Sequence, residues 1–320
     1  MNHLEALTRI NLDDVVASFG WQNSPTLQRA LRRLAHAPAR KFAELMFRFD
    51  QNIGECGLAE AARLMQQDYV RDIRLYSDPS HSVDDATALG HSSDSLGEHS
   101  LRSGQRLVPE GPFLALSNHP GAVDTLALFT ALNRPDLKII ALDRPFLRSL
   151  PNMSRQLFFV QEDAAARMSL VRQVSSHLRA GGAALTFPAG HIEPDPDIYP
   201  GAVESLQSWT DSTGVFLRMA PETAVLPVLV RGTVWDKAAR HPLLALKKTR
   251  QEKEILAASL QFLGQIGFTR KVLNVRVQIG KPIYVKNLGT TETVVIHKAV
   301  LAEMQRLIEC PPDGEGISVL

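Results

Sequence analysis

The sequence predicts a mixed α/β fold, in which a mainly parallel sheet flanked by helices follows a helical N-terminal region. Short apolar runs alternate with helical patterns from about residue 106 onward, whereas the first 78 residues show helical periodicity without such runs. A length of 320 residues, 44% of them hydrophobic, allows one or two domains with a large core. We therefore expect a helical region at 1–78, a linker at 79–105 and an α/β domain at 106–320.

The N-terminal region shows helical patterns rich in basic residues. Ser24-Pro25 is a helix-start signal, and Leu27, Leu31 and Leu34 follow at helical spacing. Pro38 is expected to start a second helical segment. The basic residues of this pair are Arg29, Arg32, Arg33, Arg40, Lys41 and Arg48. Such a pair suits a membrane surface or an acidic carrier protein, and equally a solvated face on a packed helical subdomain.

The rest of the chain divides into a linker and alternating elements. Residues 79–105 are rich in Ser, His, Asp and Gly, which is typical of a linker. Strands are expected at 112–117, 137–142, 156–160, 183–187, 224–231 and 272–279. Helices are expected at 124–132, 164–180, 200–210, 245–263 and 291–309. The strand at 272–279 alternates apolar and polar residues, so we expect it to lie half exposed near the edge of the sheet.

Charge, cysteine usage and hydropathy narrow the class of protein. A formal net charge of +1 gives no general attraction to nucleic acid or anionic lipid, so no nucleic-acid partner is expected. Cys56 and Cys310 form no C-x-x-C pair, which favours a reducing, cytoplasmic compartment. We find neither a secretory signal at the start nor an apolar stretch that would span a membrane. A lipid substrate would therefore be met from the membrane surface.

The strongest chemical signal is a histidine and an aspartate that follow a strand. His119 comes directly after the apolar run at 112–117, and Asp124 lies five positions later in the expected first turn of a helix. An imidazole is suited to accept a proton from an alcohol near neutral pH, and a carboxylate fixes its tautomer. Gly121 allows the tight turn that brings them together. The alternative is structural: His119 ends a strand and Asp124 caps a helix.

A second polar loop follows the strand at 183–187, with the sequence Phe187-Pro188-Ala189-Gly190-His191. Because α/β sheets build active sites where strands end at the carboxyl edge, we expect both loops to meet there. The order and spacing of these pieces resemble the glycerolipid acyltransferase family, whose signature is N-H-x-x-x-x-D followed by an F-P-E-G-type loop. Four blocks match in order: Asn118–Asp124, Leu142–Pro145 through Phe158–Val160, Phe187–Gly190 and Val225–Val230. They cover roughly residues 110 to 235.

The resemblance implies an O-acyltransferase of phospholipid biosynthesis. His119 would deprotonate the acceptor hydroxyl, which attacks the thioester of acyl-CoA or acyl carrier protein, and Asp124 would orient the base. The residues expected to bind substrates are Asn118, Arg144, Phe187, Pro188, Gly190, His191, Glu193 and Arg231. Backbone donors of the Gly190 loop would stabilise the oxyanion. No metal or other cofactor is implied. The partners are the thioester donor and a lipid precursor, met in the cytoplasm or on the inner face of the membrane.

Two departures from the family pattern concern the acceptor. Ala189 stands where the family has glutamate, and Ile192 stands where it has a phosphate-binding arginine. The second block closes on Glu162 instead of a basic residue. A buried phosphate needs charge-assisted hydrogen bonds worth about 1.5–3 kcal/mol each. Substitutes near the carboxyl edge are Arg144, Arg148, Arg155 and Arg231, and Glu193 can replace the missing glutamate from the next turn.

Two other functions are compatible with the motifs. His119, Asp124 and His191, with Glu193 nearby, can be read as the centre of a metal-assisted hydrolase, although the C-x-x-C of zinc deaminases is absent. The substitutions at Ala189 and Ile192 also fit a non-catalytic lipid-binding member of the fold. P-loop and G-x-S-x-G motifs are absent, which argues against an NTPase or an α/β-hydrolase.

Two further segments have open interpretations. The acidic, proline-rich segment 193–197 either closes one side of the acceptor pocket or forms an exposed turn. Residues 240–250 combine leucines with basic residues, which suits membrane docking, coenzyme A phosphates or an acidic carrier protein. An ordinary helix start with inward-packed leucines explains that pattern equally well.

Overall fold

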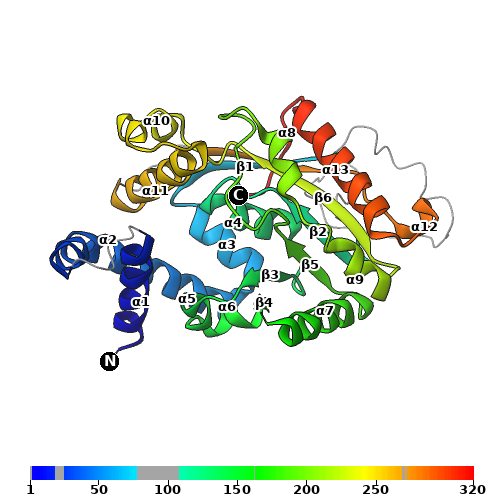
Figure 1. Ribbon diagram of the computed structural model, residues 1–320, viewed down its shortest axis with the longest axis horizontal. Coiled ribbons are helices and arrows are strands. Elements are labelled where there is room, and N and C mark those ends of the chain that lie inside the picture. The colour runs from blue at the N-terminus through cyan, green and yellow to red at the C-terminus, as the bar shows by residue number, and fades with distance from the viewer. Residues whose placement is uncertain (1, 19–24, 78–107, 162, 269–270, 272) are drawn as a thin grey trace, which may run out of the picture.

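The computed structural model describes residues 2–18, 25–77, 108–161, 163–268, 271 and 273–320. In that part of the chain, one large twisted sheet runs through the molecule with helices on both faces, and a helical N-terminal region lies at one end (Figure 1). The mixed α/β class with a mostly parallel sheet is thereby confirmed. The expected linker at 79–105 lies outside the described residues, and the division into domains stays a prediction.

The sheet has eight strands in the described residues. In spatial order they are β4 (Leu157–Val160), β3 (Lys138–Leu142), β5 (Ala183–Thr186), β2 (Phe113–Ser117), β6 (Ala224–Arg231), β7 (Leu273–Ile279), β1 (Val70–Ser77) and β8 (Ile317–Ser318). The first five are parallel to one another, β7 runs antiparallel to β6, and β1 runs parallel to β7. Because β2, β5 and β6 are adjacent and parallel, the loops that follow them emerge at the same edge.

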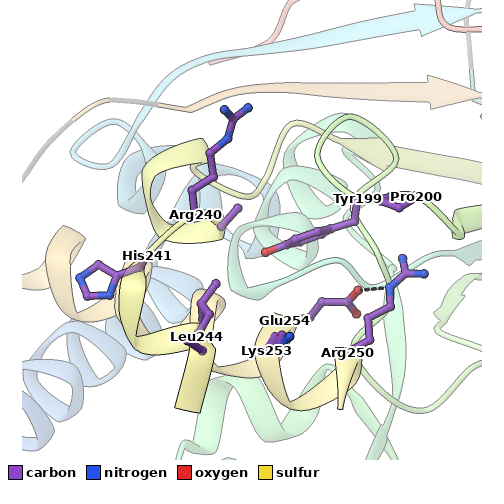
Figure 2. A pocket seen from close by; sticks show the side chains of 10 residues that line it. Tyr199, Pro200, Arg240, His241, Leu244, Arg250, Lys253 and Glu254 are labelled. Carbon is purple, nitrogen blue, oxygen red and sulfur yellow. Dashed lines mark hydrogen bonds and ion pairs between the residues drawn. The ribbon is translucent and has the colours of Figure 1, made fainter. Parts of the chain in front are cut away.

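Helices cover the two faces of this sheet. They are α1 (His3–Ser18), α2 (Pro25–Cys56), α3 (Leu58–Gln66), α4 (Ala122–Leu132), α5 (Pro145–Arg148), α6 (Pro151–Arg155), α7 (Ala164–Arg179), α8 (Ala202–Ser205), α9 (Thr213–Met219), α10 (Asp236–Ala239), α11 (Arg250–Phe268), α12 (Val285–Leu288) and α13 (Thr293–Glu309). Two 3-10 helices, η1 (Leu206–Ser208) and η2 (Pro242–Leu246), complete the set. The segments α10, η2 and α11 lie together, and a cavity opens between them and Tyr199 (Figure 2).

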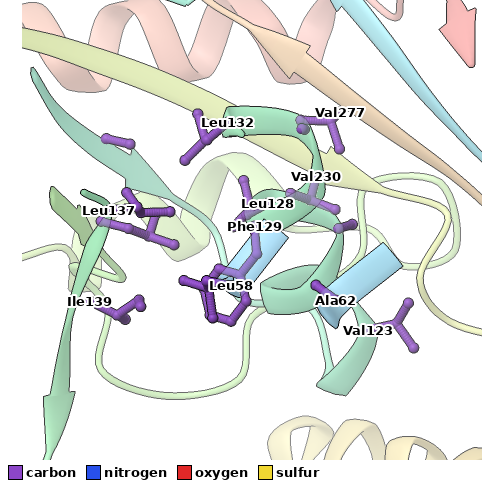
Figure 3. Packing of buried hydrophobic residues seen from close by; sticks show 14 of the residues in the cluster. Leu58, Ala62, Val123, Leu128, Phe129, Leu132, Leu137, Ile139, Val230 and Val277 are labelled. Atoms are coloured by element: carbon purple, nitrogen blue, oxygen red, sulfur yellow. The ribbon is translucent and has the colours of Figure 1, made fainter. Parts of the chain in front are cut away.

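Strand β2 explains why both faces are covered. Phe113 and Ala115 belong to one buried cluster and Leu114 and Leu116 to another, because successive side chains of a strand point to opposite faces. Helices α3 and α4 contribute to the first cluster, and α7, α9 and α13 contribute to the second. Figure 3 shows the first cluster, where α4 packs between α3 and strands β6 and β7. This packing holds the N-terminus of α4 at the end of β2.

The structure confirms the six expected strands and corrects part of the N-terminal prediction. Residues 70–77 were expected to be helical but form strand β1, which pairs with β7. Strand β7 is therefore an interior strand with neighbours on both sides, and the expectation that it lies near the edge is wrong. The alternation in β7 remains visible, since only Asn274 is exposed within it.

The helices also differ from the expectations in three places. Helix α2 continues through Pro38 instead of restarting there. Proline removes one backbone hydrogen bond of the helix. Next to Pro38, the Ala39 carbonyl accepts a hydrogen bond of 3.3 Å from the Asn11 side chain of α1. The helix expected at 200–210 is split into α8 and η1, and the helix expected at 245 begins at Arg250. Helices α4, α7 and α13 follow the prediction within two residues at each end. No described helix has the length and apolarity needed to cross a bilayer.

Candidate active site

The candidate site begins where β2 ends, in the loop that leads into α4. His119 lies in this loop, and its Nδ1 atom is 2.8 Å from Oδ2 of Asp124 in the first turn of α4. Asp124 is completely buried, and it also accepts hydrogen bonds from the Gly121 N–H and from the amide and hydroxyl of Thr125. The helix N-terminus stabilises a carboxylate at this position. Asp124 is therefore held in place before it contacts the imidazole.

The contact with Asp124 decides which nitrogen of His119 can act as a base. A carboxylate accepts a hydrogen bond, so the proton of the neutral ring belongs on Nδ1 and the lone pair on Nε2. The His119 side chain keeps 28% of its surface exposed, which leaves the ring accessible. Burial lowers the pKa of His119, but the negative charges of Asp124 and Glu193 outweigh it and raise that pKa above its usual value. Such an arrangement is chemically suited to a general base with an orienting carboxylate.

Asn118 fixes the end of β2 to its neighbour. Its Nδ2 donates to the Val230 carbonyl at 2.9 Å, and its Oδ1 accepts from the Val230 N–H at 2.8 Å. Because the side chain is buried and pairs with one residue of β6 at both ends, it sets the position at which the His119 loop leaves the sheet. The predicted substrate contact of Asn118 stays a prediction.

Glu193 supports the His119 loop from the second loop. One carboxylate oxygen accepts from the His119 N–H at 3.1 Å, and the other accepts from Trp209 Nε1 at 2.8 Å and Ser205 Oγ at 3.1 Å. The Glu193 N–H in turn donates to the His119 carbonyl at 2.9 Å. The side chain is buried, and burial raises its pKa against the opposing effect of these hydrogen bonds. Replacement of the glutamate missing at Ala189 by Glu193 stays a prediction.

The turn that follows β5 brings an aromatic ring to the histidine. The Phe187 ring lies 4.8 Å from the His119 ring, centroid to centroid, at an interplanar angle of 38°. Gly190 adopts a left-handed φ of 69° and donates its N–H to the Phe187 carbonyl at 3.1 Å. Pro188 is buried beside them, and His191 is half-buried and lowers the pKa of Glu193 by its charge. The second loop thus borders the histidine, as expected from the sequence.

The two predicted arginines lie in different surroundings. Arg144 is exposed and precedes α5. Arg231 is buried, and its guanidinium donates to the Leu307 carbonyl at 2.7 Å and to Asp197 at 3.3 Å. These contacts tie β6 to α13 and to the second loop, so they indicate a structural role for Arg231. The substrate contacts predicted for both arginines stay predictions.

The acidic segment 193–197 is more deeply built into the site than the sequence indicated. Asp195 is completely buried and accepts from the N–H groups of Gly232, Thr233 and Val234 at 3.0, 2.7 and 3.1 Å. The exposed-turn interpretation is therefore wrong for Glu193 and Asp195. The sequence carries one signal for this role, because these acids follow a buried strand and alternate with stiffening prolines.

The described residues do not form a metal centre. No group of three or more His, Cys, Asp and Glu side chains in that part of the chain is placed to hold an ion. Asp124 turns Oδ2 toward His119 Nδ1 and Oδ1 toward Thr125. His119, Asp124 and His191 therefore do not converge as the ligand set of a hydrolase.

The fold and the site together define a class: an α/β protein with a histidine and a buried carboxylate partner at the carboxyl edge of a parallel sheet. A family model described as Acyltransferase matches residues 99–231, a range that contains His119, Asp124 and Glu193. This match confirms the resemblance drawn from the motifs over residues 99–231.

Comparison with solved structures gives a distant likeness. The crystal structure of the 1-acyl-sn-glycerophosphate (LPA) acyltransferase PlsC from Thermotoga maritima shares 13% sequence identity with this chain, at a TM-score of 0.40. The match covers 96% of this chain and 93% of that one. No curated protein matches the sequence. A likeness at this level does not bear on substrate or mechanism.

Proposed function

We propose that this protein transfers a fatty acyl group from a thioester donor to a hydroxyl of a glycerol-phosphate-type or related lipid precursor. The hydrogen bond between His119 Nδ1 and the buried Asp124 carboxylate is the observation that carries this proposal. The match of residues 99–231 to the acyltransferase family model supports the type of reaction. The donor, the acceptor and the roles of individual residues are part of the proposal.

The proposed reaction moves one proton through His119. Nε2 takes the proton of the acceptor hydroxyl while the oxygen attacks the thioester carbonyl and forms a tetrahedral intermediate. The intermediate then collapses, breaks the carbon–sulfur bond and releases the thiolate, which takes the proton back from the imidazolium. Asp124 holds the ring in the required tautomer and stabilises the imidazolium. The raised pKa of His119 suits a base of this kind.

The turn at Gly190 is the proposed source of oxyanion stabilisation. The Gly190 N–H is already used on the Phe187 carbonyl, so neighbouring N–H groups of the turn would have to meet the developing charge. Glu193 would act without touching substrate, because its carboxylate accepts a hydrogen bond from the backbone N–H of His119 and so holds the loop in place. A bound acceptor would then meet a base whose position is fixed from two sides.

The acceptor is the least specified part of the proposal. Ile192 is half-buried beside Glu193 and cannot contact a phosphate by charge. Arg148 forms an ion pair with Asp143 at 2.8 Å, and Arg231 is held by α13. Arg155 ends α6 just before β4 begins, so it lies at the amino edge of the sheet instead of the expected carboxyl edge. Arg144, which is exposed, remains the proposed phosphate contact among the four arginines. A precursor without a phosphate is the second candidate, favoured by the apolar Ile192.

The test measures thioester consumption from palmitoyl-CoA with a panel of acceptors: glycerol 3-phosphate, lysophosphatidic acid and lyso-lipids that lack a phosphate monoester. We expect the rate of the His119→Ala variant to be about 10²–10⁴-fold lower, since general base catalysis contributes a factor of that size. The control is His36→Ala, because His36 lies exposed on α2. Circular dichroism confirms that each variant is folded.

The panel separates the candidate functions. His119-dependent turnover with a phosphorylated acceptor supports the glycerolipid proposal. Turnover with only the lyso-lipids that lack a phosphate monoester supports the second class of acceptor. Undiminished turnover by folded His119→Ala contradicts the mechanism. A protein that binds lysophosphatidic acid but consumes no thioester with any donor would be the non-catalytic lipid binder.

A further inference from the structure

A cavity separate from the His119 loop has no role in the reaction described so far. It has a volume of about 420 Å³ and lies between the segment from α10 to the start of α11 and the turn at Tyr199 (Figure 2). This volume is within the range of about 300–1,000 Å³ that holds small organic ligands. The segment 240–250, whose leucines and basic residues had several interpretations in the sequence, forms one wall of this cavity.

The lining combines apolar surface with an excess of positive charge. Leu244 contributes apolar surface, while Arg240, Arg250 and Lys253 are cationic and Glu254 is the carboxylate among the lining residues. Arg250 donates to Glu254 at 2.7 Å, which neutralises that pair. Arg240 pairs with Asp236 at 2.8 Å on the exposed side. Lys253 forms no ion pair with any described residue, so the cavity presents an uncompensated positive charge.

Tyr199 adds a hydrogen-bond donor. Its hydroxyl oxygen is buried and has no partner among the described residues, and Figure 2 shows it pointing between the helical segments. Burial, with weaker effects of Glu254 and Asp195, raises the pKa of Tyr199 to about 12. The hydroxyl is therefore protonated at neutral pH and suited to donate to an anion. A buried polar group without a partner is costly, which indicates that a ligand or solvent satisfies it.

The cavity is connected to the active site by short, hydrogen-bonded segments. Tyr199 is six residues after Glu193, which contacts His119, and six residues span at most about 20 Å. On the other side, the Thr233 hydroxyl lies beside Gly121, and Gln261 of α11 donates to the Thr233 carbonyl at 2.7 Å. Both walls of the cavity are thus anchored to residues that contact the His119 loop. An extended arm on a ligand in the cavity is therefore able to span the separation from the His119 loop.

We propose that this cavity binds the phosphorylated nucleotide end of a coenzyme A thioester, with Lys253 and Tyr199 as its contacts. The inference rests on the proposed function and specifies its donor. A nucleotide presents phosphates for Lys253 and the tyrosine hydroxyl and a flat, weakly polar base for the apolar wall at Leu244. The pantetheine arm then extends toward His119. A donor on a carrier protein would not require a nucleotide-sized cavity.

The test is isothermal titration calorimetry at fixed ionic strength on the full chain carrying His119→Ala, so that no turnover interferes. The probes are coenzyme A, its nucleotide end alone, pantetheine, inorganic phosphate and lysophosphatidic acid below its micelle concentration. The variants are Lys253→Glu and Tyr199→Phe. Lys248→Glu is the matched control, because Lys248 is exposed on the same segment and outside the cavity lining.

We expect coenzyme A and its nucleotide end to bind one site, and pantetheine and inorganic phosphate to bind far more weakly. Lys253→Glu should weaken binding about tenfold or more and Tyr199→Phe about threefold, whereas Lys248→Glu should change it little. Equal losses in Lys253→Glu and Lys248→Glu would reveal general charge attraction and overturn the proposal. Binding of coenzyme A that is unchanged in both Lys253→Glu and Tyr199→Phe would overturn it as well.

The outcome is distinguishable from that of the proposed function. Binding of coenzyme A that depends on Lys253 supports the cavity even if no acyl transfer is ever measured. The converse result is acyl transfer from palmitoyl-CoA by Lys253→Glu, on an otherwise unmodified chain, with the same KM for palmitoyl-CoA as the original protein. That result supports the proposed function and overturns the proposal that the cavity binds coenzyme A.

Discussion

The loop at 118–124 and the loop at 187–197 lie side by side at the carboxyl edge of the sheet, but only the first contains a histidine paired with a buried carboxylate. His119 keeps 28% of its side chain exposed, whereas Glu193 and Asp195 are 1% and 0% exposed. The first loop carries the proposed base, and two buried carboxylates of the second loop accept hydrogen bonds from backbone N–H groups. The position of the proposed base is therefore set by residues that are themselves buried from solvent.

The largest effect is expected inside the first loop, from Asp124→Asn. The amide would donate to His119 Nδ1 and move the ring proton to Nε2, which removes the lone pair that accepts the substrate proton. We expect kcat to fall by about 10²–10⁴ with the fold retained, as measured by thioester consumption and circular dichroism.

The matched control for Asp124 is Asp163→Asn. Asp163 caps α7 by accepting from the Ala166 N–H at 2.9 Å, and it has the same chemistry without a histidine. Its loss should reduce stability by about 1 kcal/mol and leave kcat unchanged. Equal kcat values for Asp124→Asn and the original protein would show that Asp124 only caps α4.

A smaller effect is expected in the second loop, from Glu193→Gln. The NH₂ group of the new glutamine would lie against the Trp209 N–H, so two donors would meet. The side chain would also lack the negative charge that raises the pKa of His119. We expect kcat to fall about tenfold and the free energy of unfolding to fall by about 1–3 kcal/mol. Glu204→Gln is the control, since Glu204 is exposed on α8 in the same region.

The pH profile shows whether Glu193 acts on the base. The proposed reaction needs neutral His119, so activity is expected to rise as the pH rises through the pKa of His119. Asp124 and Glu193 are the charged groups that raise this pKa, burial opposes them, and His191 acts on Glu193. Without the charge of Glu193 the acid limb of kcat/KM should move to lower pH. If the acid limb of kcat/KM does not move, the role of Glu193 is limited to holding the backbone of His119.

Asp195→Asn separates stability from chemistry within the second loop. Asp195 accepts from three consecutive N–H groups at 232–234 and is absent from the interactions that shift the pKa of His119. An asparagine retains one acceptor oxygen, so we expect a loss of about 1–3 kcal/mol in urea unfolding. The acid limb should not move. A shift equal to that of Glu193→Gln would show that the two carboxylates act on the base together.

The first loop and the central strands could be predicted from the sequence because they depend on local patterns. His119 and Asp124 are five residues apart on either side of a strand-to-helix turn, so local geometry alone brings them together. The buried runs of β2, β5 and β6 are equally local signals, and they placed the edge of the sheet correctly. These features needed no knowledge of distant contacts.

The features that the sequence did not predict depend on contacts between distant segments. Asp195 bonds to residues 37 to 39 positions away, and its burial follows from the position of β6 rather than from its neighbours. Strand β1 mixes charged and apolar residues, and it is a strand because β7 offers it a partner 200 residues later. In both cases the tertiary environment overrides the local pattern.

The smallest effect is expected where the two loops touch, at Phe187→Leu. The ring lies 4.8 Å from the His119 ring, and such a contact is worth about 0.5–1.5 kcal/mol beyond the area it buries. Leucine keeps the apolar cover of the imidazole but loses the ring contact, so we expect kcat/KM to fall about two- to tenfold with little change in the acid limb. Phe159→Leu is the control, because Phe159 packs under Arg148 instead of the histidine. If Phe187→Leu instead matched Asp124→Asn in kcat, the second loop would contribute directly to the chemistry, and the division between the two loops would have to be abandoned.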